Sequence, residues 1–310
     1  MPINEIQRII REGVIPQDFL KPETICDFFV DEKRKKVWGI GIDLLVKLDK
    51  VCRKNNLRYS VAFGSLLGII RHKGFIPWDD DIDVVMPRED YEKLRLLKSE
   101  FDEPYFLQYP GDDGYLFSFA KLRNSNTTSI SKPFRYESFN QGHFLDIFPF
   151  DNFCATNIEE NINRIKYLIA ECSAIMRSRN PFPDEIDRQK LAMFSSFREG
   201  KIVVKELEEV LTQFNNQPSA SYTAWCCVMY DYKRMTFDKN IFDDLIEIDF
   251  YNHKVFIPRK YHEALKITYG DYMQFPPVDK RGTWHSNSYF EPDVPYQESL
   301  VALRNQDGKV

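Results

Sequence analysis

Asp81 and Asp83 alternate with apolar residues on a predicted strand, and a Gly64-Ser65 turn precedes them along the chain. Side chains two residues apart on a strand point to the same face, so the two carboxylates project together while Ile82 faces a core. Two parallel carboxylates repel each other, and divalent cations between them relieve the repulsion. Oxygen ligands of this kind suit Mg²⁺ or Mn²⁺. The pattern therefore predicts a metal site on a sheet, and the alternative is a solvated strand edge.

A third acid, Asp146, lies in the apolar run at 142–151. A charge among strongly β-forming apolar residues is costly unless it faces a cation or a polar site. We expect Asp146 to be the third carboxylate of the metal site and the base that accepts a proton. The alternative is an acid paired with a buried cation. The predicted catalytic and metal-binding residues are therefore Asp81, Asp83 and Asp146.

The Gly64-Ser65 pair is predicted to turn a strand at 58–63 into a short helix that ends near Arg71. The first amides of a helix have no partners within it, so they suit phosphate oxygens. Arg71 and His72 belong to a basic cluster that either holds donor phosphates or neutralises the carboxylates. Gly64, Ser65, Arg71 and His72 are accordingly candidate donor-binding residues.

Lys121, Lys280 and Arg281 are candidates for the same role. Lys121 lies on a predicted strand, where a phosphate contact and a solvated basic face are both open. Lys280 and Arg281 follow a Pro-Pro turn, and we expect them to close over the donor because arginine can grip phosphate through two parallel hydrogen bonds. A solvated or packing tail is the alternative for this pair. Trp78 either packs in the core or receives a quaternary ammonium headgroup on its ring.

Asp79 and Asp80 precede the predicted strand and are interpreted as loop and capping acids rather than ligands. None of the five histidines stands at a metal-ligand spacing such as His-x₃-His, so zinc catalysis is not predicted. The six cysteines form no CxxC pair and are interpreted as reduced core residues of a cytosolic protein.

The bulk composition argues against several classes of protein. The chain has 310 residues and is 43% hydrophobic, so it can bury a sizeable core. Its formal net charge of −5 argues against a nucleic-acid binder, which usually carries a basic excess. No signal peptide and no transmembrane segment are predicted. We expect a cytoplasmic enzyme, one that can still work at the inner face of the membrane.

The periodicity predicts an α+β chain in four parts. These are an N-terminal arm (1–32), a catalytic core (33–151), a helical insertion (152–235) and a C-terminal part that completes the catalytic domain (236–310). Helices are expected at 32–55, 87–98, 158–179, 184–197, 201–214 and 261–269. Strands are expected at 58–63, 82–86, 105–109, 117–123, 127–130 and 142–151, with a hairpin at 242–256.

The run from Gly64 through Asp83 to Tyr91 resembles the LicD family, as do the stretches at 144–149 and 269–281. The strand, turn and acid order is similar to the nucleotidyltransferase (polymerase β-like) fold, a mixed sheet with flanking helices. The resemblance implies that three carboxylates hold two metal ions, Mg²⁺ or Mn²⁺, and that the turn cradles phosphates. It also implies a phosphocholine transferase that uses CDP-choline and a sugar or glycan acceptor, which can be lipid-linked.

We therefore expect metal-dependent transfer of a substituted phosphate from a CDP-linked donor to a sugar hydroxyl, with release of CMP. Some alternatives keep the same carboxylates: a nucleotidyltransferase that releases pyrophosphate, or a phosphotransferase that uses CDP-ribitol or another CDP-alcohol. A DxD glycosyltransferase would not need the turn or the third aspartate. A non-enzymatic binding module would have little reason to keep all three acids.

Overall fold

A helix of 23 residues, α2 (Glu32–Lys54), packs against the strands that carry Lys121 and Asp146. This computed structural model describes residues 4–227, 231–282, 285 and 288–307. The Asp31 side chain accepts a hydrogen bond from the Arg34 N–H and so begins the helix, and Asn55 follows its last turn. Its apolar face is buried against the sheet, because Val37, Ile40 and Leu44 recur at helical spacing. The helix predicted at 32–55 is therefore confirmed.

The central strand of the main sheet is β8 (His143–Asn152), which is ten residues long and almost wholly buried. It pairs in parallel with β4 (Asp83–Pro87) on one edge and antiparallel with β6 (Ala120–Asn124) on the other. The sheet is mixed and seven-stranded, and its other strands are β3 (Ser60–Val61), β5 (Tyr105–Gln108), β9 (Ser221–Thr223) and β10 (Thr236–Asp238). The chain is thus α+β, as expected.

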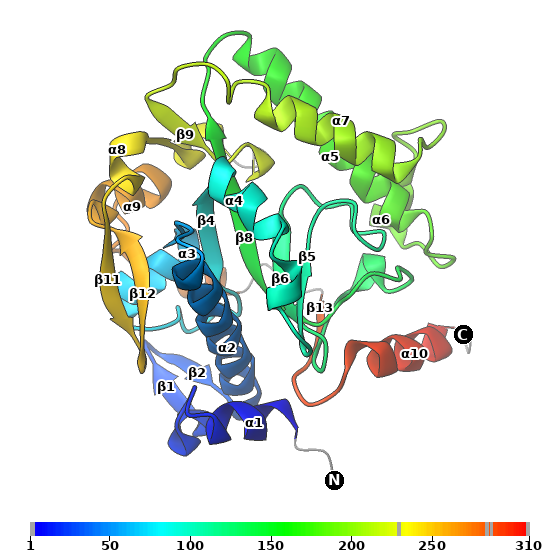
Figure 1. Cartoon of the computed structure of the whole chain (residues 1–310). Coiled ribbons are helices and arrows are strands. Elements are labelled where there is room, and N and C mark those ends of the chain that lie inside the picture. The colour runs from blue at the N-terminus through cyan, green and yellow to red at the C-terminus, as the bar shows by residue number, and fades with distance from the viewer. Residues whose placement is uncertain (1–3, 228–230, 283–284, 286–287, 308–310) are drawn as a thin grey trace.

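Helices and small hairpins surround this sheet (Figure 1). The helices are α1 (Glu5–Arg11), α3 (Phe63–Leu67), α4 (Arg88–Arg95), α5 (Ile158–Arg177), α6 (Glu185–Leu191), α7 (Gly200–Thr212), α8 (Lys239–Phe242), α9 (Tyr261–Tyr269) and α10 (Tyr296–Asp307). The paired outer strands are β1 (Glu23–Ile25) with β2 (Phe28–Val30), β11 (Leu245–Phe250) with β12 (His253–Pro258), and β7 (Thr128–Ser131) with β13 (Ser288–Glu291).

Short helical turns complete the described structure. They are η1 (Gln17–Leu20), η2 (Gly68–His72), η3 (Lys98–Glu100), η4 (Lys132–Phe134), η5 (Trp225–Cys227), η6 (Tyr232–Met235) and η7 (Val278–Lys280). The expected elements are present, mostly with shorter bounds: the strand predicted at 58–63 is reduced to β3, for example. The range 152–235 holds α5 to α7 and also β9, which extends the main sheet. The range 1–32 contains the β1–β2 hairpin, which periodicity did not indicate.

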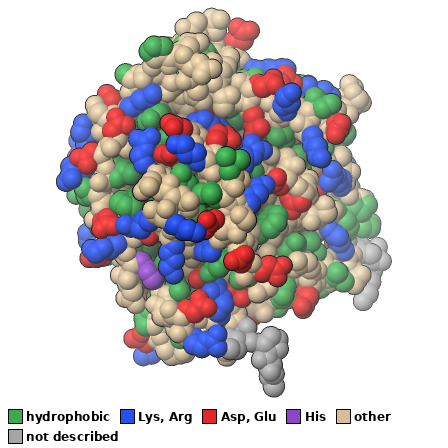
Figure 2. All heavy atoms as spheres, viewed as in Figure 1, with side chains coloured by type: hydrophobic (Ala, Val, Ile, Leu, Met, Phe, Trp, Pro, Cys, Tyr) green, Lys and Arg blue, Asp and Glu red, His purple; other side chains and the backbone are tan. Residues whose placement is uncertain are grey.

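Charges of both signs are interspersed over the face of the molecule shown in Figure 2, and no large basic area gathers there. Within the described part of the chain, no helix combines the length and the apolar character that a membrane crossing requires.

Candidate active site

Three neighbouring strands place Lys121, Asp146 and Asp83 in one row across the sheet. The register pairs Asp83 of β4 with Asp146 of β8, and Asp146 with Lys121 of β6. Residues directly opposite on paired strands point to the same face, so the three side chains meet above the sheet. Lys121 and Asp146 are both buried and form an ion pair. Asp146 thus combines both sequence interpretations, since it lies beside the other acids and also pairs with a buried cation.

Asp81 joins this row from just before β4. One carboxylate oxygen from each of Asp81, Asp83 and Asp146 lies within 4.8 Å of the others. Burial raises the pKa of Asp81 and Asp83 well above the usual aspartate value; the charge of Asp83 adds to this effect at Asp81, and the charge of Asp146 adds to it at Asp83. One ammonium group faces three acids here. The donor set and its excess negative charge fit divalent cations that prefer oxygen ligands.

Gly64 and Ser65 hold Asp83 in place. The Ser65 hydroxyl oxygen accepts the Asp83 backbone N–H at 2.8 Å, and the Gly64 N–H donates to the Asp83 side chain. A methyl group added at Gly64 would lie 3.1 Å from Asp79 Oδ2 and 3.9 Å from Asp83 Oδ2. The expected turn is therefore present and lies beside the acids, where its polar groups contact Asp83.

The turn begins at Phe63, which has a φ of +47°. This left-handed conformation is unfavourable for a bulky residue and is found mostly where packing enforces it. The Phe63 ring packs against Phe148 at 5.6 Å and Phe237 at 6.5 Å between centroids. Packing of the ring therefore fixes the sharp reversal that brings Gly64 over the acids.

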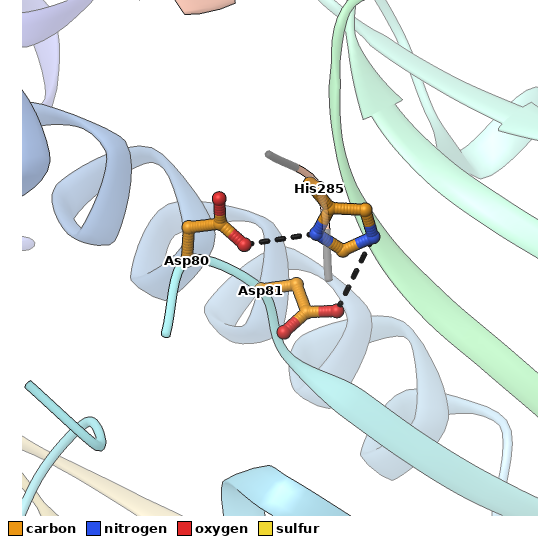
Figure 3. A group of neighbouring side chains, drawn as sticks. All are labelled: Asp80, Asp81 and His285. Carbon is orange, nitrogen blue, oxygen red and sulfur yellow. Dashed lines mark hydrogen bonds and ion pairs between the residues drawn. The ribbon is translucent and has the colours of Figure 1, made fainter. Parts of the chain in front are cut away.

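Asp79, Asp80, Tyr269 and His285 also lie at the site, although none of them is among the predicted site residues. Burial and the neighbouring Asp80 charge raise the pKa of Asp79. The Tyr269 hydroxyl comes within 4.0 Å of the Cβ position at Gly64, and the charges of Asp83 and Asp79 add to burial in raising its pKa. Figure 3 shows the His285 ring with one nitrogen facing Asp80 and the other facing Asp81. The run of three acids at 79–81 was the available signal for the first two.

Arg71, His72 and Arg281 form a cationic and aromatic group with Phe275. Arg71 donates to the Tyr272 and Gln274 carbonyls at 2.7 and 3.0 Å, and its Nε donates to His72 Nε2 at 3.0 Å. The His72 ring stacks on Phe275 at 5.3 Å, and burial lowers the pKa of His72 to about 4. Among the described residues, no carboxylate pairs with Arg71 or Arg281.

Arg281 bridges separate segments of the chain. Its guanidinium donates to the Pro276 and Cys26 carbonyls at 3.1 and 3.0 Å and lies over the Trp78 ring at 5.0 Å. Trp78 itself is buried. A guanidinium of the chain itself therefore lies on this ring, which favours the packing interpretation of Trp78 over the headgroup interpretation.

The remaining predicted donor contacts differ in exposure. Lys280 is exposed at the end of η7, which starts directly after Pro277. Lys121 is buried and paired with Asp146, so the alternative of a solvated basic face is wrong. Its long side chain also lies over the Phe144 ring, with Nζ 3.4 Å from the ring centre.

A mixed sheet that gathers three aspartates beside a glycine turn defines a protein with a candidate divalent-metal site. Residues 56–169 match the family model described as the LicD/FKTN/FKRP nucleotidyltransferase domain. The chain is 27% identical to the lipopolysaccharide cholinephosphotransferase LicD of Haemophilus influenzae over 259 residues, which cover 79% of this chain and 93% of that protein. Both findings support the LicD family for this chain. The resemblance drawn from the sequence motifs is therefore confirmed.

Shorter matches occur in two further proteins. Over 60 residues, or 19% of this chain, it is 37% identical to the uncharacterized protein RP689 of Rickettsia prowazekii, of which the match covers 23%. A match of the same length to the uncharacterized protein RT0683 of Rickettsia typhi is 35% identical and covers 19% of that protein.

Proposed function

We propose that this chain is a phosphotransferase that moves phosphocholine, or a similar substituted phosphate, from a CDP-linked donor such as CDP-choline to a sugar hydroxyl of a cell-surface glycan or its precursor. CMP is the second product. The observation that carries the proposal is the cluster of Asp81, Asp83 and Asp146 inside the segment that matches the family model. The name of the Haemophilus relative, which covers most of this chain, supports the transferred group and the class of acceptor.

The proposal includes the nucleotidyltransferase, polymerase β-like fold for the catalytic core. The order β3, α3, β4 and later β8, with Asp81 just before β4, Asp83 at its start and Asp146 on β8, supports this assignment. It makes α3 and its glycine turn part of the donor site, because Gly64 leaves room beside the acids that any side chain would fill.

Asp81, Asp83 and Asp146 would hold Mg²⁺ or Mn²⁺, and we propose two ions. When bound, the ions neutralise and orient the donor diphosphate, and this charge stabilisation is worth several kcal/mol. The fit rests on the three carboxylates gathered within 4.8 Å and on the charge that Lys121 leaves uncompensated.

In the transfer step, the acceptor oxygen forms a bond to the phosphorus that carries the choline group, and the bond from this phosphorus to the CMP oxygen breaks. Asp146 accepts the proton of the acceptor hydroxyl, and its ion pair with Lys121 holds the carboxylate in position for this role. Most of the catalytic effect then comes from positioning the two reactants.

Arg71 and Arg281 are the cations proposed to face the donor phosphates, together with exposed Lys280. The two guanidinium groups contact mainly backbone carbonyls in the described structure and are not neutralised by its carboxylates. Both guanidinium groups lie by the same Phe275 ring, at 5.1 and 5.6 Å from its centre, and the Arg281 charge adds to burial in lowering the pKa of Arg71. A phosphate between them would relieve this repulsion.

The deciding experiment measures product formation from a panel of CDP-linked donors: CDP-choline, CDP-ethanolamine and CDP-ribitol, each with a glycan acceptor and Mg²⁺ or Mn²⁺. Release of CMP with transfer of the substituted phosphate is the expected result. Transfer of the nucleotide itself, with pyrophosphate released from CTP, would instead identify a nucleotidyltransferase.

A further inference from the structure

His285 comes from the C-terminal part of the chain and reaches the loop before β4. Its Nδ1 lies 2.8 Å from Asp80 Oδ1, and its Nε2 lies 3.8 Å from Asp81 Oδ2 (Figure 3). Asp80 is buried, and the ligand atoms of Asp80, Asp81 and His285 all lie within 4.8 Å of one another. Asp81 therefore belongs to this group and also to the three-carboxylate cluster.

The contact with Asp80 orients the His285 ring. The tautomer that donates from Nδ1 to the Asp80 carboxylate has its lone pair on Nε2. That lone pair is on the side of Asp81. A metal-binding histidine commonly donates its other ring N–H to a carboxylate, which orients the ring and makes the ligand more basic.

The distance between Nε2 and the Asp81 carboxylate also fits two ligands of one ion. At 3.8 Å it exceeds a hydrogen bond. Two ligand atoms that are each about 2.1 Å from a metal ion are separated by roughly 3.0 Å at a right angle and about 4.2 Å when opposite. The observed separation lies inside this range.

We propose that Asp81 and His285 Nε2 bind a divalent ion at a site of mixed oxygen and nitrogen ligands, and that Asp80 is the positioning residue for His285. The inference deepens the proposed function, on which it rests for the role of the ion. The ligands of this site, one oxygen and one nitrogen, differ chemically from those of the neighbouring three-carboxylate site, which are all oxygens. Imidazole suits transition metals, whereas Mg²⁺ prefers oxygen, so this site favours Mn²⁺ over Mg²⁺.

The test uses Mn²⁺ alone, bound to the full chain and followed by electron paramagnetic resonance. A nitrogen directly bound to Mn²⁺ produces a modulation in the electron spin echo, and labelling histidine with the heavy nitrogen isotope changes its pattern. We expect this modulation in the wild-type protein and its loss in His285→Gln. Asp80→Asn should keep the modulation at saturation but weaken Mn²⁺ binding at this site about 10- to 100-fold, the usual effect of losing such a partner.

His253→Gln is the matched control, because His253 Nε2 contacts the Val14 carbonyl on another part of the molecule, and a glutamine amide can still donate to that oxygen. It should keep the modulation. Asp146→Asn should also keep it, because Asp146 is not a member of this group, while the carboxylate site loses affinity.

Two results would overturn the inference: no nitrogen modulation in saturated wild-type protein, or a modulation that survives in His285→Gln. The second would direct attention to His143, which is buried and has no partner for either ring nitrogen among the described residues. Neither result would affect CMP release from the CDP donor panel. Conversely, modulation that depends on His285 in a protein without transferase activity would keep the metal site and reject the proposed reaction.

Discussion

Asp83 contacts several of the other residues of the site. Its backbone N–H is fixed by Ser65, its side chain receives the Gly64 N–H, and its strand neighbour in the parallel register is Asp146. Burial and the Asp146 charge raise its pKa, so without a bound cation this carboxylate is held in an unfavourable environment. A carboxylate that is held in place by hydrogen bonds and is also repelled by neighbouring charges is typical of a metal ligand rather than of a structural acid.

Asp83→Asn should reduce transferase activity more than a thousandfold, because the amide is a much weaker ligand and ions bound here are worth several kcal/mol. The fold should remain intact or become more stable without metal, because the substitution removes one of three clustered like charges. Initial rates and urea denaturation of the metal-free protein measure the two effects. Activity within about tenfold of wild type, roughly 1.4 kcal/mol, would remove Asp83 from the metal site.

Glu137 gives a pH-dependent prediction away from the site. Its side chain is fully buried, Oε2 pairs with Arg179 at 2.5 Å, and Oε1 has no partner among the described residues. Burial raises the pKa of Glu137 from 4.5 to about 7, against the opposing effect of Arg179. Between these two values the folded state binds more protons than the unfolded state, so the free energy of unfolding falls as pH rises through this window.

Glu137→Gln should therefore stabilise the protein at pH values above about 7 by about 1–3 kcal/mol and have little effect near the acid end of the window. Urea denaturation of both proteins across the window measures the difference. Glu209→Gln, at an exposed position on α7, is the control and should show no such pH dependence. Equal stability differences at both ends of the window would show that Glu137 is not protonated in the folded state.

At the scale of elements, the register of β6, β8 and β4 makes Lys121, Asp146 and Asp83 one unit. Lys121 is the cation of this row, and its removal leaves Asp146 buried and unpaired beside two further acids. Removal of Asp146 is different, because the Lys121 ammonium group still interacts with Asp83 and Asp81. The two substitutions should therefore have unequal effects on stability.

Lys121→Met should lower the free energy of unfolding of the metal-free protein by about 3–5 kcal/mol, the usual effect of breaking a buried ion pair. Asp146→Asn should cost clearly less, and the double variant should recover part of the loss caused by Lys121→Met. A double-mutant cycle by urea denaturation gives the coupling. Lys254→Met on the exposed β11–β12 hairpin is the control. Equal costs for both single variants would contradict the asymmetry.

Elements that follow from local periodicity were predictable, and contacts between distant segments were not. The pattern of α2 and the alternation around Asp81 and Asp83 are local, and the structure has them nearly at the expected bounds. The Asp146 assignment needed one further inference, since a lone acid in an apolar strand must face something polar. Nothing local pairs Asp80 with His285, which lie 205 positions apart, or shows that Arg281 covers Trp78.

At the scale of the whole molecule, three separated parts of the chain meet around the site. The core strands supply the acids, the C-terminal segment supplies Arg281, Phe275 and His285, and the N-terminal hairpin region supplies the Cys26 carbonyl that Arg281 contacts. A single guanidinium thus links the first and last parts of the chain across the loop that carries Trp78. Arg281 therefore has two expected roles, one in packing and one in donor binding, and different measurements can distinguish them.

Arg281→Ala should lower the free energy of unfolding by about 1–2 kcal/mol, because two hydrogen bonds from a partly buried charged group and its contact with Trp78 are lost. Hydrogen exchange should increase in both segments that it joins, around Cys26 and around Pro276. Arg281→Lys keeps the charge but not the planar fork, so it should recover donor binding better than it recovers exchange protection. The measurements are hydrogen exchange by mass spectrometry and initial rates against donor concentration. A raised KM for the donor with unchanged exchange would make phosphate binding the main role of Arg281. Increased exchange with an unchanged KM would instead make its main role the packing of the C-terminal segment against the N-terminal hairpin region.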